Sequence, residues 1–141
     1  MIRALFALLS VVTLSGTLVV AQQKPRIEKK EIQQTPPADA KEMFSTYCAT
    51  CHGSSGKGDG PAAAALKKVP ADLTKISARN GGKFPAVQVN HYIMGVETMA
   101  AHGSRDMPIW GNLFRSLSPA DRTVAELRAH NLTEYLRAMQ Q

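Results

Sequence analysis

Two cysteines and one histidine, placed close together, are the residues of this sequence best suited to chemistry. Cys48, Cys51 and His52 form the pattern C-x-x-C-H. Two thiols three residues apart at a helix end can each bond a vinyl group on the same porphyrin edge, and the histidine that follows then lies under the iron. The pattern therefore predicts a covalently attached haem with His52 as its proximal iron ligand.

A redox disulfide and half of a zinc site are the competing interpretations of the cysteine pair. A zinc site needs another pair of Cys or His ligands at suitable spacing, and the chain contains only 2 cysteines. A thioredoxin-like disulfide needs a βαβ context, which the sequence lacks. The glycine-rich stretch at 53–60 does not fit a phosphate-binding loop either, since no Gly-Lys pair there is followed by Ser or Thr. We predict a tight loop around the haem edge instead.

The sixth iron ligand must come from a methionine or histidine downstream of the motif, and Met107 is the best placed. Met107 lies in a loop-like segment, RDMPIWG at 105–111, where Pro108 stiffens the backbone and disfavours helix at Met107. A thioether on a stiff loop can reach the iron from the far side. Three other side chains have a packing role or lie on the last helix: Met94, Met139 and His130. The alternatives that stay open are Met99, His102, His91 and an open iron site.

The elements that position these residues are expected to be helices, at about residues 39–49, 61–68, 85–95 and 118–139. Asp39 and Ser118 are the expected N-caps of the first and last helices. The last helix has the clearest apolar stripe, with Arg128 off it: Val124, Leu127, Leu132, Tyr135, Leu136 and Met139. No alternating strand pattern of useful length occurs, so the expected fold class is all-α with long loops. A haem would give those loops something to pack on.

The first 37 residues differ in composition from the rest of the chain. Residues 1–21 combine a basic start, an apolar stretch and a small-residue end, which predicts a signal peptide; an uncleaved N-terminal anchor is the competing interpretation. A signal peptide and an uncleaved anchor would both direct the remaining chain across the inner membrane. Residues 22–37 are charged, Gln-rich and poor in large apolar groups, which predicts a flexible linker. The folded domain is then expected over residues 38–141.

Over about residues 38–140 the sequence resembles a class I (monohaem) c-type cytochrome of the bacterial periplasmic kind. The resemblance rests on CATCHG at 48–53, GKGDGPAAAALK at 56–67, PADLT at 70–74, MPIWG at 107–111 and the final helix. It implies a small cytochrome c fold, with four or so helices and long loops wrapped around one covalently bound haem c. It also implies that His52 precedes the methionine ligand, Met107, by some tens of residues, as it does here.

The same resemblance carries two finer implications. The first and last helices should cross at a small residue and aromatics, which here are Ala40 and Phe44 against Leu132 and Tyr135. Ala40 stands where a glycine is commoner in the family. The carbonyl of Pro61 is implied as the hydrogen-bond acceptor for the second ring nitrogen of the proximal histidine, a bond that fixes the ring and raises its basicity.

The function implied is single-electron transfer through haem c with His/Met ligation, in a periplasmic respiratory or dehydrogenase-linked chain, rather than enzymatic catalysis. The iron cycles between ferric and ferrous states, and a thioether ligand favours the reduced state. Two alternatives stay open: a fixed haem c subunit of a membrane oxidoreductase complex, and a haem protein with open iron that acts as a sensor or peroxidase. We expect a periplasmic monomer, in contact with a membrane only if the leader is retained.

The charge of the chain, +6 at neutral pH, favours docking to an acidic redox partner protein. Between Cys48 and Ser118 the sequence contains eight basic side chains and four acidic ones. The basic residues are Lys57, Lys67, Lys68, Lys75, Arg79, Lys83, Arg105 and Arg115, and the acidic residues are Asp59, Asp72, Glu97 and Asp106. The alternative is that these charges only keep the protein soluble. Nucleic acid is not an expected partner, because no basic cluster is interleaved with aromatics.

Overall fold

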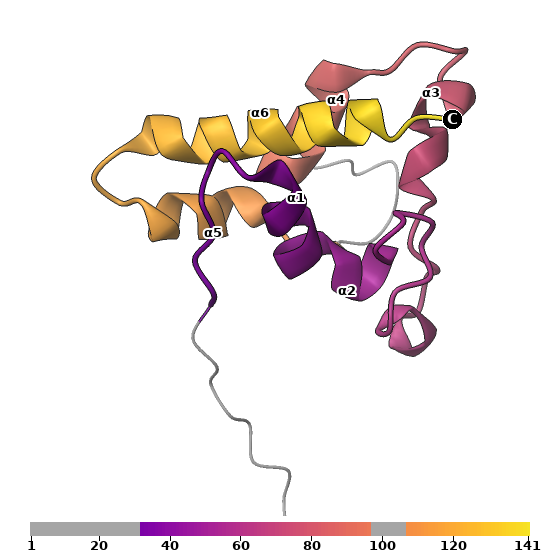
Figure 1. Cartoon of the computed structure of the whole chain (residues 1–141), viewed down its shortest axis with the longest axis horizontal. Helices are drawn as coiled ribbons and strands as arrows, with labels where there is room; N and C mark the ends of the chain where they lie inside the picture. Colours follow the sequence, from indigo (N-terminus) through magenta and orange to yellow (C-terminus); the bar gives the residue numbers. More distant parts are fainter. Residues whose placement is uncertain (1–31, 97–106) are drawn as a thin grey trace, which may run out of the picture. The chain divides into compact units, whose positions relative to one another are not determined.

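The last helix, α6, is the element against which α1, α4 and α5 pack (Figure 1). The computed structural model describes residues 32–96 and 107–141, and Ile32–Gln141 form one unit. The helices in chain order are α1 (Ala40–Met43), α2 (Ala49–His52), α3 (Ile76–Arg79), α4 (Ala86–Met94), α5 (Trp110–Leu117) and α6 (Arg122–Ala138). A π-helical turn, Phe44–Cys48, joins α1 to α2, and 3₁₀ turns occupy Ala63–Ala65 and Leu73–Lys75. The described residues form no strand, which confirms the all-α prediction.

The core lies where α6 contacts α1, α4 and α5. Its buried apolar side chains are Met43, Phe44, Tyr47, Val89, Ile93, Met94, Phe114, Ala125, Ala129, Leu132 and Leu136. Helix α1 contacts α6, the rings of Phe44 and Tyr135 lie 5.4 Å apart between centroids, and Ala40 and Leu132 belong to the same packed core. The predicted crossing of the first and last helices is therefore confirmed.

The helix boundaries agree with the sequence at some ends and differ at others. Asp39 caps α1 by accepting a hydrogen bond from the amide of Glu42 (2.8 Å), as predicted. The N-cap of α6 is Asp121, so the prediction of Ser118 was wrong. The Asp121 carboxylate accepts from both the amide and the hydroxyl of Thr123, at 2.9 and 2.6 Å, whereas Ser118 begins the turn that precedes the helix.

Two further predictions about helices need correction. The helix expected over 61–68 is only the 3₁₀ turn Ala63–Ala65, because the backbone of Leu66 is already extended (φ −87°, ψ 143°) and ends the helical turn there. Helix α5 was not predicted, since Pro108 and Gly111 gave its sequence the character of a loop. Gly111 is buried where α5 meets α4, and a Cβ on it would overlap the carbonyl oxygen of Met94.

The stripe predicted for the last helix is also wrong at two neighbouring positions. Leu127 is 44% exposed, whereas Arg128 is only 4% exposed. Arg128 is covered by residues 32–37, which we call the N-terminal strap: its Nη2 donates to the carbonyl of Thr35 (2.7 Å) and its Nη1 to the hydroxyl of Thr35 (3.0 Å). The end of the predicted linker therefore packs on the domain.

The predicted signal peptide, residues 1–21, and linker residues 22–31 lie outside the described residues. Within the part of the chain that the structure describes, no helix has both the length and the apolar character needed to cross a bilayer.

Candidate functional site

The C-x-x-C-H residues lie at the end of the first helical segment, which continues from α1 through the π-helical turn to α2. Cys48 ends the π-helical turn, and Cys51 and His52 lie in the last turn of α2. Residues three and four apart share one face of a helix, so Cys51 and His52 lie on the same face as Cys48. All three side chains are partly buried, and neither cysteine is in a disulfide. No pattern in the sequence marks the π-helical turn, a feature often found at functional sites.

The glycine-rich stretch holds the end of α2 by capping its carbonyl groups. The amide of Gly58 donates to His52 (2.8 Å), that of Gly60 to Cys51 (3.1 Å) and that of Ala62 to Thr50 (2.9 Å). These carbonyls have no partners within the helix, so the loop supplies the hydrogen-bond donors that the helix end lacks. A Cβ on Gly60 would lie 2.6 Å from the carbonyl oxygen of Ala49, which explains why the close approach needs glycine. The loop is thus tight, as the sequence predicts.

The ring of His52 is held by a backbone carbonyl, but not by that of Pro61. Nδ1 of His52 lies 3.1 Å from the carbonyl oxygen of Ala71. The implied role of Pro61 is therefore wrong: Pro61 belongs to the loop that caps α2, and the carbonyl that meets the ring is that of Ala71, ten residues later. Because a carbonyl oxygen can only accept, Nδ1 carries the proton and Nε2 of the neutral ring keeps a lone pair.

Burial lowers the pKa of His52 below 6.5, although its bond to Ala71 acts in the opposite direction. The neutral ring is therefore favoured at neutral pH. A neutral imidazole with one nitrogen fixed as a donor is the form that ligates a metal through the other nitrogen.

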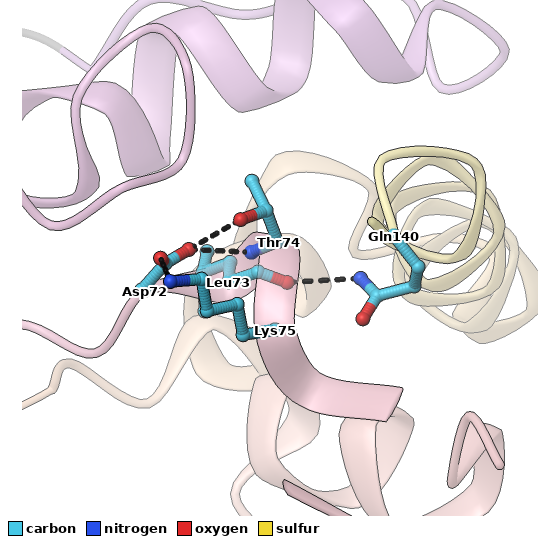
Figure 2. A network of polar contacts seen from close by, with 5 residues as sticks. All are labelled: Asp72, Leu73, Thr74, Lys75 and Gln140. Atoms are coloured by element: carbon cyan, nitrogen blue, oxygen red, sulfur yellow. Dashed lines mark hydrogen bonds and ion pairs between the residues drawn. The ribbon is translucent and has the colours of Figure 1, made fainter. Parts of the chain in front are cut away.

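The segment around Ala71 is fixed by three contacts. The amide of Leu73 donates to the carbonyl of Gly56 (2.7 Å), which attaches the segment to the glycine-rich loop. The carboxylate of Asp72 accepts from the amide and hydroxyl of Thr74, at 2.9 and 2.6 Å (Figure 2). A Cβ on Gly58 would overlap the carbonyl oxygen of Pro70. The glycine-rich loop and the segment around Pro70 can therefore approach this closely only because residue 58 is glycine.

The cysteine environment argues against a redox disulfide. Burial, with a smaller contribution from Cys51, raises the pKa of the Cys48 thiol to about 12. Reactive C-x-x-C pairs depend on a lowered thiol pKa, so this environment is the reverse of a thioredoxin-like one. Two free thiols on one helix face beside an imidazole with an available Nε2 fit covalent haem: Cys48 and Cys51 would hold its edge and His52 its iron.

Met107 begins the second described segment, three residues before α5, and its side chain is 39% exposed. The start of α5 is anchored by Trp110, whose ring lies 5.6 Å from that of Tyr47 and 6.5 Å from that of Phe114. Met94 is buried in the core, as predicted. Met99 and His102, which the sequence left open as ligands, lie outside the described residues.

The family model of Cytochrome c matches residues 37–139. The chain belongs to the cytochrome c family, which confirms the resemblance and the fold expected from it. No curated protein and no solved structure matches the chain significantly. Membership of this family implies covalent haem c and haem-based electron transfer, and the spacing of Cys48 and Cys51 before His52 agrees with that.

The residue that sequence reasoning missed at the site is Ala71, which acts through its main chain. The sequence does carry a signal: Asp72 and Thr74 form an Asp-x-Thr pattern directly after Ala71. Asp and Thr side chains bond nearby backbone amides and so fix turns. The pattern marks a rigid segment, although it does not say which carbonyl meets the histidine.

Proposed function

We propose that this protein is a single-electron carrier, not an enzyme, with one haem c attached through Cys48 and Cys51 and ligated by His52 and Met107. The observation that carries the proposal is the hydrogen bond between Nδ1 of His52 and Ala71, which directs the lone pair of the ring to Nε2. A respiratory or dehydrogenase-linked chain in the periplasm is the setting that fits an exported domain of this family.

The two cysteines, the histidine and the methionine have different roles toward the haem. Cys48 and Cys51 would attach the haem covalently at the end of α2, and the capped carbonyls of that helix keep its last turn rigid. His52 would ligate the iron, and the bond to Ala71 raises the basicity of the ring. The thioether of Met107 would be the second protein ligand of the iron and would exclude small ligands. When bound, the haem supplies one-electron redox chemistry, and a thioether ligand raises its reduction potential.

Replacing Met107 tests the ligand set. Met107→Ala should lose the sulfur-to-iron absorption of the ferric protein, gain carbon monoxide binding in the ferrous protein and shift to a lower potential, because the iron loses its soft ligand. Met94→Leu is the matched control, since Met94 lies in the core and leucine nearly conserves its volume. Carbon monoxide binding by the unmutated protein, or full retention of the absorption in Met107→Ala, would contradict Met107 as the ligand.

The covalent attachment has its own readout in the same preparations. The haem should stay with the denatured chain through acid and organic extraction, and replacing either cysteine should lower the yield of holoprotein. Haem that leaves the unmutated chain on extraction would contradict attachment through the cysteines.

The proposed partners are redox proteins with acidic docking surfaces. Six of the predicted basic residues are exposed in the structure: Lys57, Lys67, Lys68, Lys75, Arg79 and Lys83. Glu97, Arg105 and Asp106 lie outside the described residues. Surface charges are screened over about 8–10 Å at ordinary ionic strength, so reduction by the physiological donor should slow as salt rises. A second-order rate that is flat or rises with salt would leave these side chains a role in solubility alone.

A further inference from the structure

The last two residues of the chain are hydrogen bonded to the segment that holds the proximal histidine. Gln140 and Gln141 follow α6 and lie beside the segment 73–77, so the C-terminus ends next to α3 (Figure 1). The amide of Gln141 donates to the carbonyl of Thr74 (3.0 Å). This contact uses only the main chain, so it is available to any residue at position 141 other than proline.

Gln140 makes the contacts that depend on a particular side chain. Its Nε2 donates to the carbonyl of Leu73 (2.9 Å) and to that of Leu136 (2.6 Å), while its Oε1 accepts from the amide of Ser77 (2.9 Å). Figure 2 shows the amide of Gln140 pointing from α6 towards the carbonyl of Leu73. One neutral side chain thus binds both a carbonyl and an amide of the segment 73–77 and ties them to the last turn of α6.

The carbonyl of Leu73 lies two residues from that of Ala71, which accepts the hydrogen bond of His52. The chain between them is stiff, because Asp72 bonds the amide and hydroxyl of Thr74 and the amide of Leu73 is bound to Gly56. A displacement at Leu73 is therefore passed to Ala71 rather than absorbed between them.

We infer that Gln140 is a positioning residue for the proximal ligand: by fixing the segment 71–77 to α6 it keeps the carbonyl of Ala71 in hydrogen-bond contact with Nδ1 of His52. The inference rests on the proposed role of His52 as iron ligand. It extends that role to the C-terminus, more than eighty residues further along the chain. Through the basicity of the ring, Gln140 then affects the reduction potential.

The test uses the holoprotein with Gln140→Met, which conserves length and removes both the donor and the acceptor. The Nδ1 proton of His52, followed by NMR in the reduced protein, should exchange about fivefold faster, the factor that corresponds to the loss of about 1 kcal/mol, a typical hydrogen bond. The potential should shift upward, because a ring with a weaker Nδ1 bond donates less to ferric iron. Gln140→Glu keeps the acceptor for Ser77 but no donor for Leu73, so it should behave like Gln140→Met and replaces it if the methionine variant accumulates poorly.

Two controls separate positioning from loss of stability. Gln141→Ala keeps the main-chain bond to Thr74, and Thr133→Val removes a buried hydroxyl that donates to Ala129 (2.7 Å) on the same helix. Neither should change the exchange of the His52 proton or the potential. Unchanged exchange and potential in Gln140→Met, with haem attached, would overturn this inference alone. A wild-type protein in which His52 does not ligate the iron would overturn the proposed function and this inference with it.

Discussion

The N-terminal half of α6 and the residues just after its C-terminal end are both tied by polar side chains to distant segments of the chain, but the two ties differ in chemistry. In the N-terminal half, Arg128 is almost completely buried and binds the N-terminal strap. Its partners are neutral oxygens and a sulfur, and its Nε has no partner among the described residues. Beyond the C-terminal end, Gln140 is partly exposed, and its neutral amide binds the segment 73–77.

The comparison shows that the degree of burial of a connecting side chain does not indicate how much it matters for the candidate site. Arg128 begins a chain of hydrogen bonds in which Thr35 donates to Tyr47 (3.1 Å) and Tyr47 donates to the carbonyl of Gln33 (2.8 Å). In the described part of the chain, the hydrogen-bond partners of these groups do not include the segment 71–77, whose Ala71 carbonyl bonds His52. Gln140 makes weaker contacts with neutral groups, yet it binds that segment directly. We expect the first tie to govern stability and the second to govern the proximal ligand.

The largest expected effect on stability comes from Arg128→Met. The variant removes the donors to both oxygens of Thr35, and hydrogen bonds from a charged group contribute about 1.5–3 kcal/mol each, part of which the relieved burial of the charge offsets. The free energy of unfolding should therefore fall by about 2–3 kcal/mol, measured by denaturant titration. The potential and the exchange of the His52 proton should stay close to wild type. A shift in either as large as that of Gln140→Met would show that the two ties are not separate.

Tyr47→Phe sharpens this expectation, because Tyr47 shares the hydroxyl of Thr35 with Arg128. Alone it should cost about 1 kcal/mol. Combined with Arg128→Met it should cost clearly less than the sum, since residues in one hydrogen-bond chain couple. Additive losses would mean that the strap is held at two independent points.

The outcome for Arg128 illustrates which parts of the fold a sequence can predict. Periodicity predicted the helices at 85–95 and in the C-terminal region, and capping predicted the start of the first helix at Asp39, because both signals are local. They placed Arg128 on the solvent side, since nothing local indicates that a segment 93 residues earlier covers it. Similarly, Pro108 suggested a loop where α5 begins, and the sequence does not show that Gly111 packs closely on Met94 of α4 within a helix.

The candidate site shows the same division between local and long-range information. Cys48, Cys51 and His52 were predicted from one pentapeptide, since the chemistry requires that spacing. The hydrogen-bond partner of His52 was assigned to Pro61 but is Ala71, because a carbonyl acceptor is available at every residue and only the path of the loop selects one. No sequence pattern indicates the role of Gln140 either, because its partners in the segment 73–77 are 63 and 67 residues away in the sequence.

The smallest expected effect comes from a matched pair of carboxylates, Asp72 beside the site and Asp121 at the N-terminus of α6. Each accepts from the amide and hydroxyl of a threonine two residues later, at 2.9 and 2.6 Å. The threonine hydroxyl is the main cause that lowers each pKa below 3.8. A carboxyl group whose pKa is lower in the folded state adds stability that is fully present above its unfolded pKa. That stability is lost as the pH falls through the folded pKa.

Asp72→Asn and Asp121→Asn should therefore each lower the thermal midpoint slightly at neutral pH, and the difference from wild type should shrink as the pH falls from 3.8 through the lower folded pKa. Asparagine keeps the acceptor oxygen, so both turns should survive the change. The two variants should differ in one respect: only Asp72→Asn loosens the segment that carries Ala71 and so speeds exchange of the Nδ1 proton of His52. Equal exchange in both variants, measured beside their melting curves, would mean that the ring responds to global stability and that its segment is not held separately.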